Sequence, residues 1–561
     1  MKRCKTDLRI CRQLIEALLF ENLLSCTEKE VGGIIHFHIP LQSAVLLCSG
    51  KRGAFGRIRI KGESIRLEKG TNSEAISLDK LLNSADFPSA FSLELKQTKK
   101  LTQWNEQHLT QTENRSSLSY EELESAIWEG HPYHPCFKSR TGFSLEDHEQ
   151  YGPEAGNPFA LVWLACPEKE VRRSFPNEEL FWNSEIGQVY DELMERLDKK
   201  GGQRNQYSLI PVHPWQWKAV RDRVKGAIFL GEGAELYRAT QSIRTLWNTE
   251  RSEKAHIKLS MNLAHTSSIR TIAPSAAAAA PAISEWLSTI AKADPLLSST
   301  KVLKEYASVS WEPVECDVQP GEVGVIFRES PRSVLAAGEE AVPLNACSLT
   351  EENGKLFIES WLQQYGVEKW LKQLIQIVII PIWHFLIRHG IALEAHAQNV
   401  VLIVKNGWPV GMAVRDFHDS IEYVESFLAE PEKAPRFWAI HPDFKKGKSD
   451  EFYWMSSVEG LRELVMDTLF VFHFTELSSA LNQRGILDES SFWSWVENAL
   501  AEFEREHPEL ESRIKEIGYR KKWIQAEALL SQKIAPSKPI HHTVVNVFAE
   551  KDRSDRDVLH R

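Results

Sequence analysis

Three basic side chains and a set of hydroxyl groups gather in the middle of the chain, in SIRTLWN and HIKLSMNLAHTSSIRTIAP. Two Ser-Ile-Arg-Thr elements, Ser242–Thr245 and Ser268–Thr271, lie on either side of Lys258. Arg244, Lys258 and Arg270 alternate with apolar residues, so strands could direct all three into one cleft. Such cations beside Ser and Thr hydroxyls suit the binding of polyphosphate and carboxylate groups. Surface charge on two strands is the competing interpretation, and the pattern favours neither.

A second polar group, EAHAQN at Glu394–Asn399, precedes RDFHD at Arg415–Asp419. A hydrophobic helix predicted to end at Gly390 leads into the first motif, and a hairpin separates the two. The arrangement is analogous to the catalytic loop of protein kinases and the metal-binding aspartate that follows it. Carboxylate and amide oxygens are the hard ligands that Mg²⁺ prefers. Four such polar side chains are costly to bury without a ligand, so we favour a functional role.

Two motifs contain His-Pro pairs. In GHPYHPCFKSRTGF, two such pairs precede Lys138 and Arg140. The two cations suit carboxylate or phosphate binding, although a proline-stiffened turn with solvated charges is the better interpretation of this motif in isolation. In IPVHPWQW, apolar flanks predict a buried element, and His213 is expected to be a core histidine.

The elements that position these motifs are predicted to form an α+β fold. A first amphipathic helix, short strands with β-branched residues and further helical sequence precede a polar tract, TQTENRSSLS, that we expect to be a linker. The five alanines after Ser275 indicate a helix start or a tight surface segment. From about residue 350 the pattern is mainly helical, with a hairpin made of VVLIV and WPVGMAVRDF. The chain from Pro536 is polar, and we expect it to fray.

Composition limits the function classes. The chain has 561 residues and a formal net charge of -10, which argues against general nucleic-acid binding. The longest apolar run, Ile375 to Leu386, is too short to span a bilayer, so we expect a buried helix, no stable membrane association and a cytoplasmic protein. The eight cysteines are scattered without a CxxC pair and are expected to be reduced structural thiols. No Walker loop or dinucleotide fingerprint occurs.

Together and in this order, GHPYHPCFKSRTGF, IPVHPWQW, SIRTL, KLSMNLAHTSSIRTIAP, EAHAQN and RDFHDS resemble the NRPS-independent siderophore synthetases of the IucA/IucC type. The resemblance is specific from about residue 120 to about residue 425, and general in character outside that range. It implies a multi-domain fold shaped like a cupped hand. The expected divisions are an N-terminal thumb at 1–120, a β-rich fingers domain at 121–345, a mainly helical palm at 346–535 and a polar tail at 536–561.

The resemblance also implies the reaction. ATP adenylates a carboxylate, with citrate or a citrate derivative favoured and 2-oxoglutarate as another option, and pyrophosphate leaves. An amine or amino alcohol then displaces AMP to form the product, so the enzyme is an amide-forming ligase. ATP and Mg²⁺ are the expected cofactors, small molecules are the partners, and a homodimer is left open.

Residue roles follow from the same resemblance. The ATP phosphates would be held by Ser242, Arg244, Thr245 and Lys258. Arg270 would bind the carboxylate, and His396 would stabilise the adenylation transition state, so the catalytic set is His396, Arg270 and Lys258. The expected Mg²⁺ ligands are Glu394, Asn399 and Asp416. Gln398 would contact nucleotide or substrate, and the loop over the nucleotide would contribute His134, Lys138 and Arg140.

Two alternatives remain open at this stage. Another ATP-using ligase or a phosphotransferase on a similar cleft would release ADP in place of AMP. A siderophore-binding or ferric-siderophore reductase-like protein would need clustered cysteines for an iron–sulfur centre, which the scattered cysteines do not provide. The sequence does not name the carboxylate, the amine or the siderophore.

Overall fold

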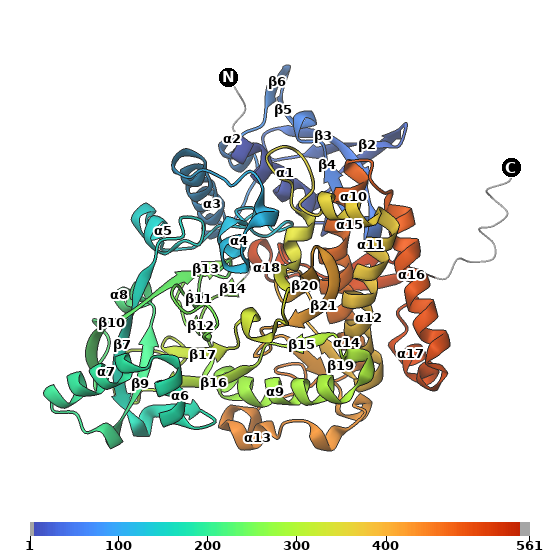
Figure 1. The fold of residues 1–561 in the computed structure, drawn as a ribbon. Coiled ribbons are helices and arrows are strands. Elements are labelled where there is room, and N and C mark those ends of the chain that lie inside the picture. Colours follow the sequence, from blue (N-terminus) through green and yellow to red (C-terminus); the bar gives the residue numbers. More distant parts are fainter. Residues whose placement is uncertain (1–4, 267, 550–561) are drawn as a thin grey trace.

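The computed structural model describes residues 5–266 and 268–549, and it is a mixed helix and sheet protein, as predicted (Figure 1). The N-terminal part is a helix on an antiparallel sheet of order β1-β2-β3-β5-β6, with β4 paired to β3. Phe37 and Ile39 of β2 are buried whereas His36 and His38 are exposed, which is the alternation of a half-buried strand. Its elements are α1 (Lys5–Phe20), β1 (Thr27–Val31), β2 (Ile34–Pro40), β3 (Val45–Arg52), β4 (Ile58–Ile60), β5 (Arg66–Lys69), β6 (Asn72–Ala75), α2 (Leu78–Leu82) and α3 (Ser89–His108).

The middle of the chain forms an eight-stranded sheet of order β8-β16-β17-β12-β11-β10-β7-β9. Aromatic side chains such as Trp163, Trp182 and Phe327 fill a core of its own beside this sheet. The elements of this part are α4 (Tyr120–Ala126), α5 (Leu145–Tyr151), β7 (Phe159–Pro167), β8 (Val171–Ser174), α6 (Glu178–Glu185), α7 (Gln188–Lys199), β9 (Tyr207–Val212), α8 (Pro214–Val220), β10 (Ile228–Ala239), β11 (Thr245–Asn248), β12 (His256–Leu259), β13 (Ala264–His265), β14 (Ser268–Ile269), α9 (Pro274–Ala293), β15 (Thr300–Val302), β16 (Glu305–Trp311), β17 (Gly324–Arg328) and β18 (Glu340–Pro343).

The C-terminal part is mainly helical, as expected, and includes the predicted hairpin β20–β21. Its elements are α10 (Glu359–Tyr365), α11 (Val367–Leu374), α12 (Ile380–His384), β19 (Ile391–Leu393), β20 (Val400–Lys405), β21 (Trp408–Val414), β22 (Ile421–Tyr423), α13 (Phe437–Ile440), α14 (Val458–Val465), α15 (Thr475–Gln483), α16 (Glu489–Glu506), α17 (Glu511–Ile517), β23 (Trp523–Glu527), α18 (Ser531–Ile534) and β24 (His541–Val545).

The parts are joined through shared sheets and a shared core. The sheet of order β15-β21-β20-β18 takes two strands from before residue 345 and two from after it. The largest core combines α1 and the N-terminal sheet with the C-terminal helices, and Phe20 packs edge-on against Phe472 at a ring distance of 6.4 Å. The domain boundaries therefore stay a prediction, and each expected division packs closely against its neighbours.

A long buried helix leads to the EAHAQN loop. It runs from Val367 to His389 with π-helical turns on either side of α12, and Gly390 ends it in the left-handed conformation at φ 78°. A Cβ at Gly390 would lie 2.2 Å from the carbonyl oxygen of Phe427, so only glycine fits there. By length and composition this helix and Val458–Gln483 could cross a membrane, but 78% and 83% of their most apolar stretches lie inside the protein.

Three local expectations are settled by burial. The tract 110–119 is not a free linker, because Arg115 is fully buried and ion-paired with Glu129 at 2.9 Å and Glu351 at 3.0 Å. The alanine run belongs to α9 and is largely buried, so it is a core helix. The expectation that the chain frays after Pro536 is wrong up to residue 549: β24 pairs with β23, and Phe548 is buried. Residues 550–561 lie outside the described residues.

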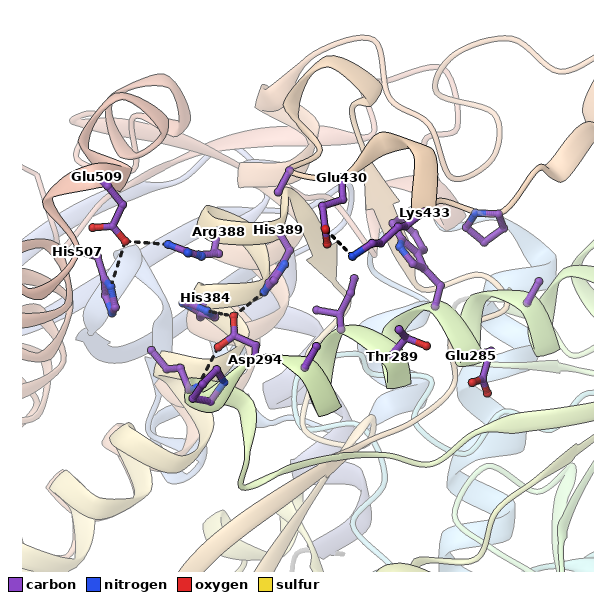
Figure 2. Close-up of a pocket in the computed structure, with 18 residues that line it drawn as sticks. Glu285, Thr289, Asp294, His384, Arg388, His389, Glu430, Lys433, His507 and Glu509 are labelled. Carbon is purple, nitrogen blue, oxygen red and sulfur yellow. Dashed lines mark hydrogen bonds and ion pairs between the residues drawn. The ribbon is translucent and has the colours of Figure 1, made fainter.

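A shared carboxylate fastens α9 to the long helix, as Figure 2 shows. Asp294, just after α9, accepts hydrogen bonds from Nε2 of His384 at 2.8 Å and of His389 at 2.9 Å. Burial alone would raise the pKa of Asp294, but His384, His389 and the backbone N–H of Leu296 together outweigh burial and the pKa is lowered. Although three such donor atoms could hold a metal ion, Nδ1 of buried His384 has no hydrogen-bond partner, whereas a metal-binding imidazole needs one. We therefore interpret the group as a structural clamp.

We expect Asp294→Ala to destabilise the protein by about 3 kcal/mol, because two enclosed imidazole N–H groups lose their acceptor. The measurement is the thermal unfolding midpoint of the purified variant. Glu285→Ala is the matched control, since Glu285 is an exposed carboxylate of α9 that lines the same cavity. Equal midpoints for the two variants would show that the clamp contributes nothing.

Candidate functional site

One cavity of about 490 Å³ collects most of the predicted site residues. Eleven of the thirteen line it: Lys138, Arg140, Ser242, Arg244, Lys258, Arg270, Glu394, His396, Gln398, Asn399 and Asp416. The larger cavity of about 1090 Å³ in Figure 2 is lined by none of them. Elements far apart in sequence, from the His-Pro loop to β23, therefore meet at one place.

A buried ionic cluster forms the floor of this cavity. Oδ1 of Asp416, which follows β21, accepts from Nζ of Lys258 on β12 at 2.8 Å and from Nη1 of Arg328 on β17 at 2.7 Å. Burial alone would raise the pKa of Asp416, but Arg328 and Lys258 outweigh it and hold the pKa well below its usual range. Sheet and loop are thus linked through one ionised carboxylate.

Glu305 and His418 extend the cluster and were not predicted. Glu305 Oε1 lies 3.2 Å from Nδ1 of His418, and its Oε2 accepts from the backbone N–H of Phe417 at 3.2 Å. Glu305 is fully buried at the start of β16. Its sequence context, KEYASVSW, has no motif that marks it as functional, and only the pairing of β16 beside β17 brings it here.

Two guanidinium groups face the cavity without a carboxylate partner. Neither Arg244 nor Arg270 forms an ion pair among the described residues. Nη1 of Arg244 donates to the carbonyls of Arg270 and Thr271 at 2.9 and 2.7 Å, which fixes its position. Nε of Arg270 is buried without a partner, and burial together with nearby Arg244 lowers the pKa of Arg270 to about 10. These two guanidinium groups are therefore positioned to bind an anion.

The EAHAQN loop is held in one conformation by its own backbone. Nδ1 of His396 accepts from the backbone N–H of Gln398 at 3.2 Å, so the neutral ring has its proton on Nε2. Enclosure lowers the pKa of His396, which keeps the ring neutral at pH 7. Nδ2 of Asn399 donates to the carbonyl of Glu394 at 3.1 Å. His396 is thus a neutral hydrogen-bond donor at the cavity.

Glu124 on α4 ties two site loops together and was also missed. It accepts from Nη1 of Arg415 at 2.9 Å and from Nε2 of Gln241 at 2.9 Å. Those two residues directly precede Asp416 and Ser242 in the chain. Tyr120 hydrogen-bonds to both Glu124 and Arg415, which completes a fully enclosed network. A glutamate in an ordinary helix offers no sequence signal for such a role.

The His-Pro loop matches the prediction only in part. Lys138 and Arg140 line the cavity, but both are ion-paired with buried Glu154, which neutralises one of their two charges. His134 does not line the cavity; it is buried, and its Nδ1 accepts from the backbone N–H of Cys136 at 3.0 Å. Of the two histidines in this loop, His131 of the first pair is the one that lines the cavity. His213, as expected, is a core histidine that caps α8.

Thr245 is the other predicted residue outside the cavity lining. It lies on β11 opposite Lys258, is buried, and its backbone N–H donates to Oγ of Ser242 at 3.1 Å. Its own hydroxyl is buried without a hydrogen-bond partner among the described residues. Ser242 lines the cavity, whereas Thr245 does not.

Backbone strain is concentrated around this site. Eight non-glycine residues of the described chain have a left-handed backbone, and four of them lie in the site loops: Arg140, Ile243, Thr266 and Asp416. For a β-branched residue such as Ile243, at φ 69°, the conformation is costly. Such strain persists where the surrounding structure fixes it, and it is typical of functional sites.

The oxygen donors fit a hard divalent cation in chemical type. Glu394, Asn399 and Asp416 line one cavity and offer carboxylate and amide oxygens. Oδ1 of Asp416 is taken by Lys258 and Arg328, which leaves Oδ2 as its free ligand atom. A second group, Glu305, Asp416 and His418, has donor atoms within 4.8 Å of one another. Its imidazole makes it less suited to Mg²⁺.

Comparison with known proteins finds two family models that match parts of this chain. Residues 119–349 match the model of the IucA / IucC family, and residues 368–546 match that of the ferric iron reductase FhuF-like transporter. A citryl-spermidine/3,4-dihydroxybenzoyl-citryl-spermidine:spermidine ligase of Bacillus anthracis is 36% identical, over 94% of this chain and 90% of its own. The 2-[(L-alanin-3-ylcarbamoyl)methyl]-3-(2-aminoethylcarbamoyl)-2-hydroxypropanoate synthase of Staphylococcus aureus is 30% identical, over 97% and 92%.

A solved structure agrees over nearly the whole chain. The petrobactin biosynthesis protein AsbB of Bacillus anthracis matches with a TM-score of 0.90 and 33% identity, covering 99% of this chain and 96% of its own. The reductase alternative is not favoured, because the two relatives described above are named as a ligase and a synthase, and residues 368–546 contain no cysteine. The chain therefore belongs to the IucA/IucC family and is an amide-forming ligase of siderophore biosynthesis.

Proposed function

We propose that this enzyme uses ATP to adenylate citrate or a citryl derivative and then transfers the acyl group to an amine in the cytoplasm. The observation that supports this most directly is the enclosed pair Arg244 and Arg270, which face the cavity without a carboxylate of their own. Two fixed guanidinium groups bind carboxylate and phosphate oxygens through paired hydrogen bonds. The named substrate of the Bacillus relative is likewise a citryl compound.

The chemistry proceeds in two balanced steps. A carboxylate oxygen of the substrate attacks the α-phosphorus of ATP, the bond to the bridging oxygen breaks, and pyrophosphate leaves. The uncharged amine nitrogen then attacks the acyl carbon, the bond between that carbon and the AMP oxygen breaks, and the nitrogen releases a proton to solvent. Neither step needs a covalent bond to the protein, so positioning and charge stabilisation provide the catalysis.

The predicted site residues that line the cavity each have a part in this scheme. Ser242, Arg244 and Lys258 bind phosphate oxygens, Arg270 binds the carboxylate, and Gln398 contacts nucleotide or substrate. Glu394, Asn399 and Asp416 would hold Mg²⁺, which would neutralise phosphate charge when bound. Lys138 and Arg140, fixed by Glu154, together present one net positive charge at the cavity wall.

His396 stabilises charge and does not act as a base. A carboxylic acid titrates near pH 4, so the attacking group is already ionised at neutral pH and needs no deprotonation. The backbone N–H of Gln398 occupies Nδ1 of His396, which leaves Nε2–H as the donor. A fixed donor of this type stabilises negative charge that develops on the α-phosphate.

The half-reaction tests the proposed function. With citrate and Mg-ATP but no amine, we expect exchange of labelled pyrophosphate into ATP, and hydroxylamine should trap the acyl group as a hydroxamate. Omitting the carboxylate is the control and should abolish exchange. Release of ADP and phosphate as the products, over a panel of carboxylic acids, would rule out adenylation.

For Arg270, we expect the Ala variant to raise the KM for the carboxylate by at least about tenfold, because a charge-assisted hydrogen bond is lost. The KM for ATP should change little. Arg270→Lys should recover only part of the loss, since lysine lacks the planar fork. Arg221→Ala, on the exposed end of α8, is the control. A parallel rise in both KM values would instead assign Arg270 to general cavity structure.

For His396, the Ala variant should reduce the pyrophosphate exchange rate by about a hundred- to a thousandfold at unchanged ATP affinity, because one preorganised donor is lost. Exchange per folded molecule and the thermal midpoint are both measured, with His36→Ala at an exposed position of β2 as the control. If stability falls while the rate per folded molecule stays close to wild type, His396 only holds the loop.

A further inference from the structure

One corner of the cavity holds an amide oxygen that has no partner. Asn345 follows β18, on the short helical turn Leu344–Ser348, and lines the cavity. Its Nδ2 donates to Oε1 of Gln241 at 2.6 Å, whereas its Oδ1 is buried without a hydrogen-bond partner among the described residues. An unpaired buried acceptor costs free energy, and a hydrogen-bond donor on a bound ligand offsets that cost.

A relay of three side chains fixes the direction of this amide. Burial alone would raise the pKa of Glu124, but Arg415 and the hydrogen bonds from Tyr120, Arg415 and Gln241 outweigh burial and lower the pKa. An ionised carboxylate only accepts hydrogen bonds, so Gln241 must direct its Nε2 toward Glu124, at 2.9 Å. Oε1 of Gln241 then points away from Glu124 and can only accept, so Asn345 must direct its Nδ2 toward it. The charge of Glu124 thus keeps Oδ1 of Asn345 as the free group of the relay.

The chemistry of the substrates limits what can meet this acceptor. Phosphate and carboxylate oxygens only accept hydrogen bonds, and a ribose hydroxyl can donate or accept, so it needs no amide of fixed direction. The 6-amino group of adenine only donates, and it projects from a flat ring with apolar faces. Ile127, three residues after Glu124, lines the same cavity and offers apolar surface to such a ring. Gln241 directly precedes Ser242, the proposed phosphate ligand, so one loop serves both ends of a nucleotide.

We propose that Asn345 selects adenine as the base of the nucleotide, and that Glu124 and Gln241 are positioning residues that keep its acceptor turned toward the base. The inference rests on the proposed function, because it concerns the base of the ATP which that function uses. Oδ1 of Asn345 accepts a hydrogen bond from the 6-amino group. A base with a carbonyl at that position would place two acceptors face to face. Asn345 cannot turn over to avoid this contact, because its Oδ1 would then face Oε1 of Gln241.

ATP and inosine triphosphate (ITP) form a matched pair that tests the inference. They share ribose and phosphates, and a carbonyl replaces the 6-amino group in ITP. We measure hydroxamate formation with citrate and hydroxylamine, and expect kcat/KM to be about ten- to a hundredfold higher for ATP. Asn345→Leu should remove most of this preference by lowering kcat/KM for ATP, with no matching loss for ITP. Asn353→Leu, at an exposed position outside the cavity lining, is the control and should keep the preference.

The relay itself is tested at Gln241. In Gln241→Met the side chain keeps its length but loses the amide that fixes Asn345. The amide of Asn345 can then turn over and present Nδ2 to the carbonyl of ITP. We therefore expect kcat/KM for ITP to rise about three- to tenfold, which a residue that only shapes the cavity would not produce. This variant also keeps the inference testable if Asn345→Leu does not fold.

Binding without turnover separates the inference from the proposed function. ATP and ITP are titrated calorimetrically into the wild type and both variants. Tighter binding of ATP than of ITP, with hydroxamate formed from neither, would support the base subsite and contradict adenylation. Equal affinity and equal kcat/KM for the two nucleotides in the wild type would overturn the base subsite. It would also be overturned by an equal loss for both nucleotides in Asn345→Leu, or by a change in that variant confined to the KM of the amine.

Discussion

The burial of one ionised carboxylate, Asp416, sets the arrangement of the whole site. An isolated charge in the protein interior costs several kcal/mol, so Asp416 is stable there only while Lys258 and Arg328 contact it. Those cations lie on neighbouring strands of the eight-stranded sheet, and Asp416 follows the hairpin of a different sheet. The position of the hairpin relative to the sheet is thus fixed by charge as well as by packing. Removing any member would leave an uncompensated charge at the cavity floor.

The ion pairs of the other site cations show which charges are free for a ligand. Lys138 and Arg140 share Glu154 and keep one positive charge between them, and Arg415 is matched by Glu124, so these side chains shape the loops. Arg244 and Arg270 are held by backbone carbonyls and remain without a counter-charge. Left-handed backbone at Ile243 and Asp416 adds strain beside those groups. The unpaired guanidinium groups and the strained backbone thus lower the stability of the protein at this site. We expect the charge of bound substrate to restore it.

The sequence predicts those parts of the site whose residues lie together in contiguous motifs. The hairpin and the helix end at Gly390 follow local rules of turns and caps. Ser242, Arg244, Arg270 and the polar residues of EAHAQN line one cavity, whereas Thr245 does not. Glu124 and Glu305 were missed because their neighbours in sequence are ordinary helix or strand residues. Their roles arise from strand order and from contacts across more than a hundred residues. The turn directs the side chain of His131 toward the cavity and that of His134 away from it. The composition of the motif does not determine which of the two faces the cavity.

The cavity is lined by residues from both parts of the chain that match a family model. The cations Arg244, Lys258 and Arg270 all belong to the part that matches the IucA / IucC family model. Glu394, His396, Asp416, Asp467 and Glu527 belong to the part that matches the FhuF-like model. Joined by a shared sheet and a continuous core, the two parts enclose both charges in one low-dielectric space. In that space the charges of the lining residues interact more strongly than they would in solvent.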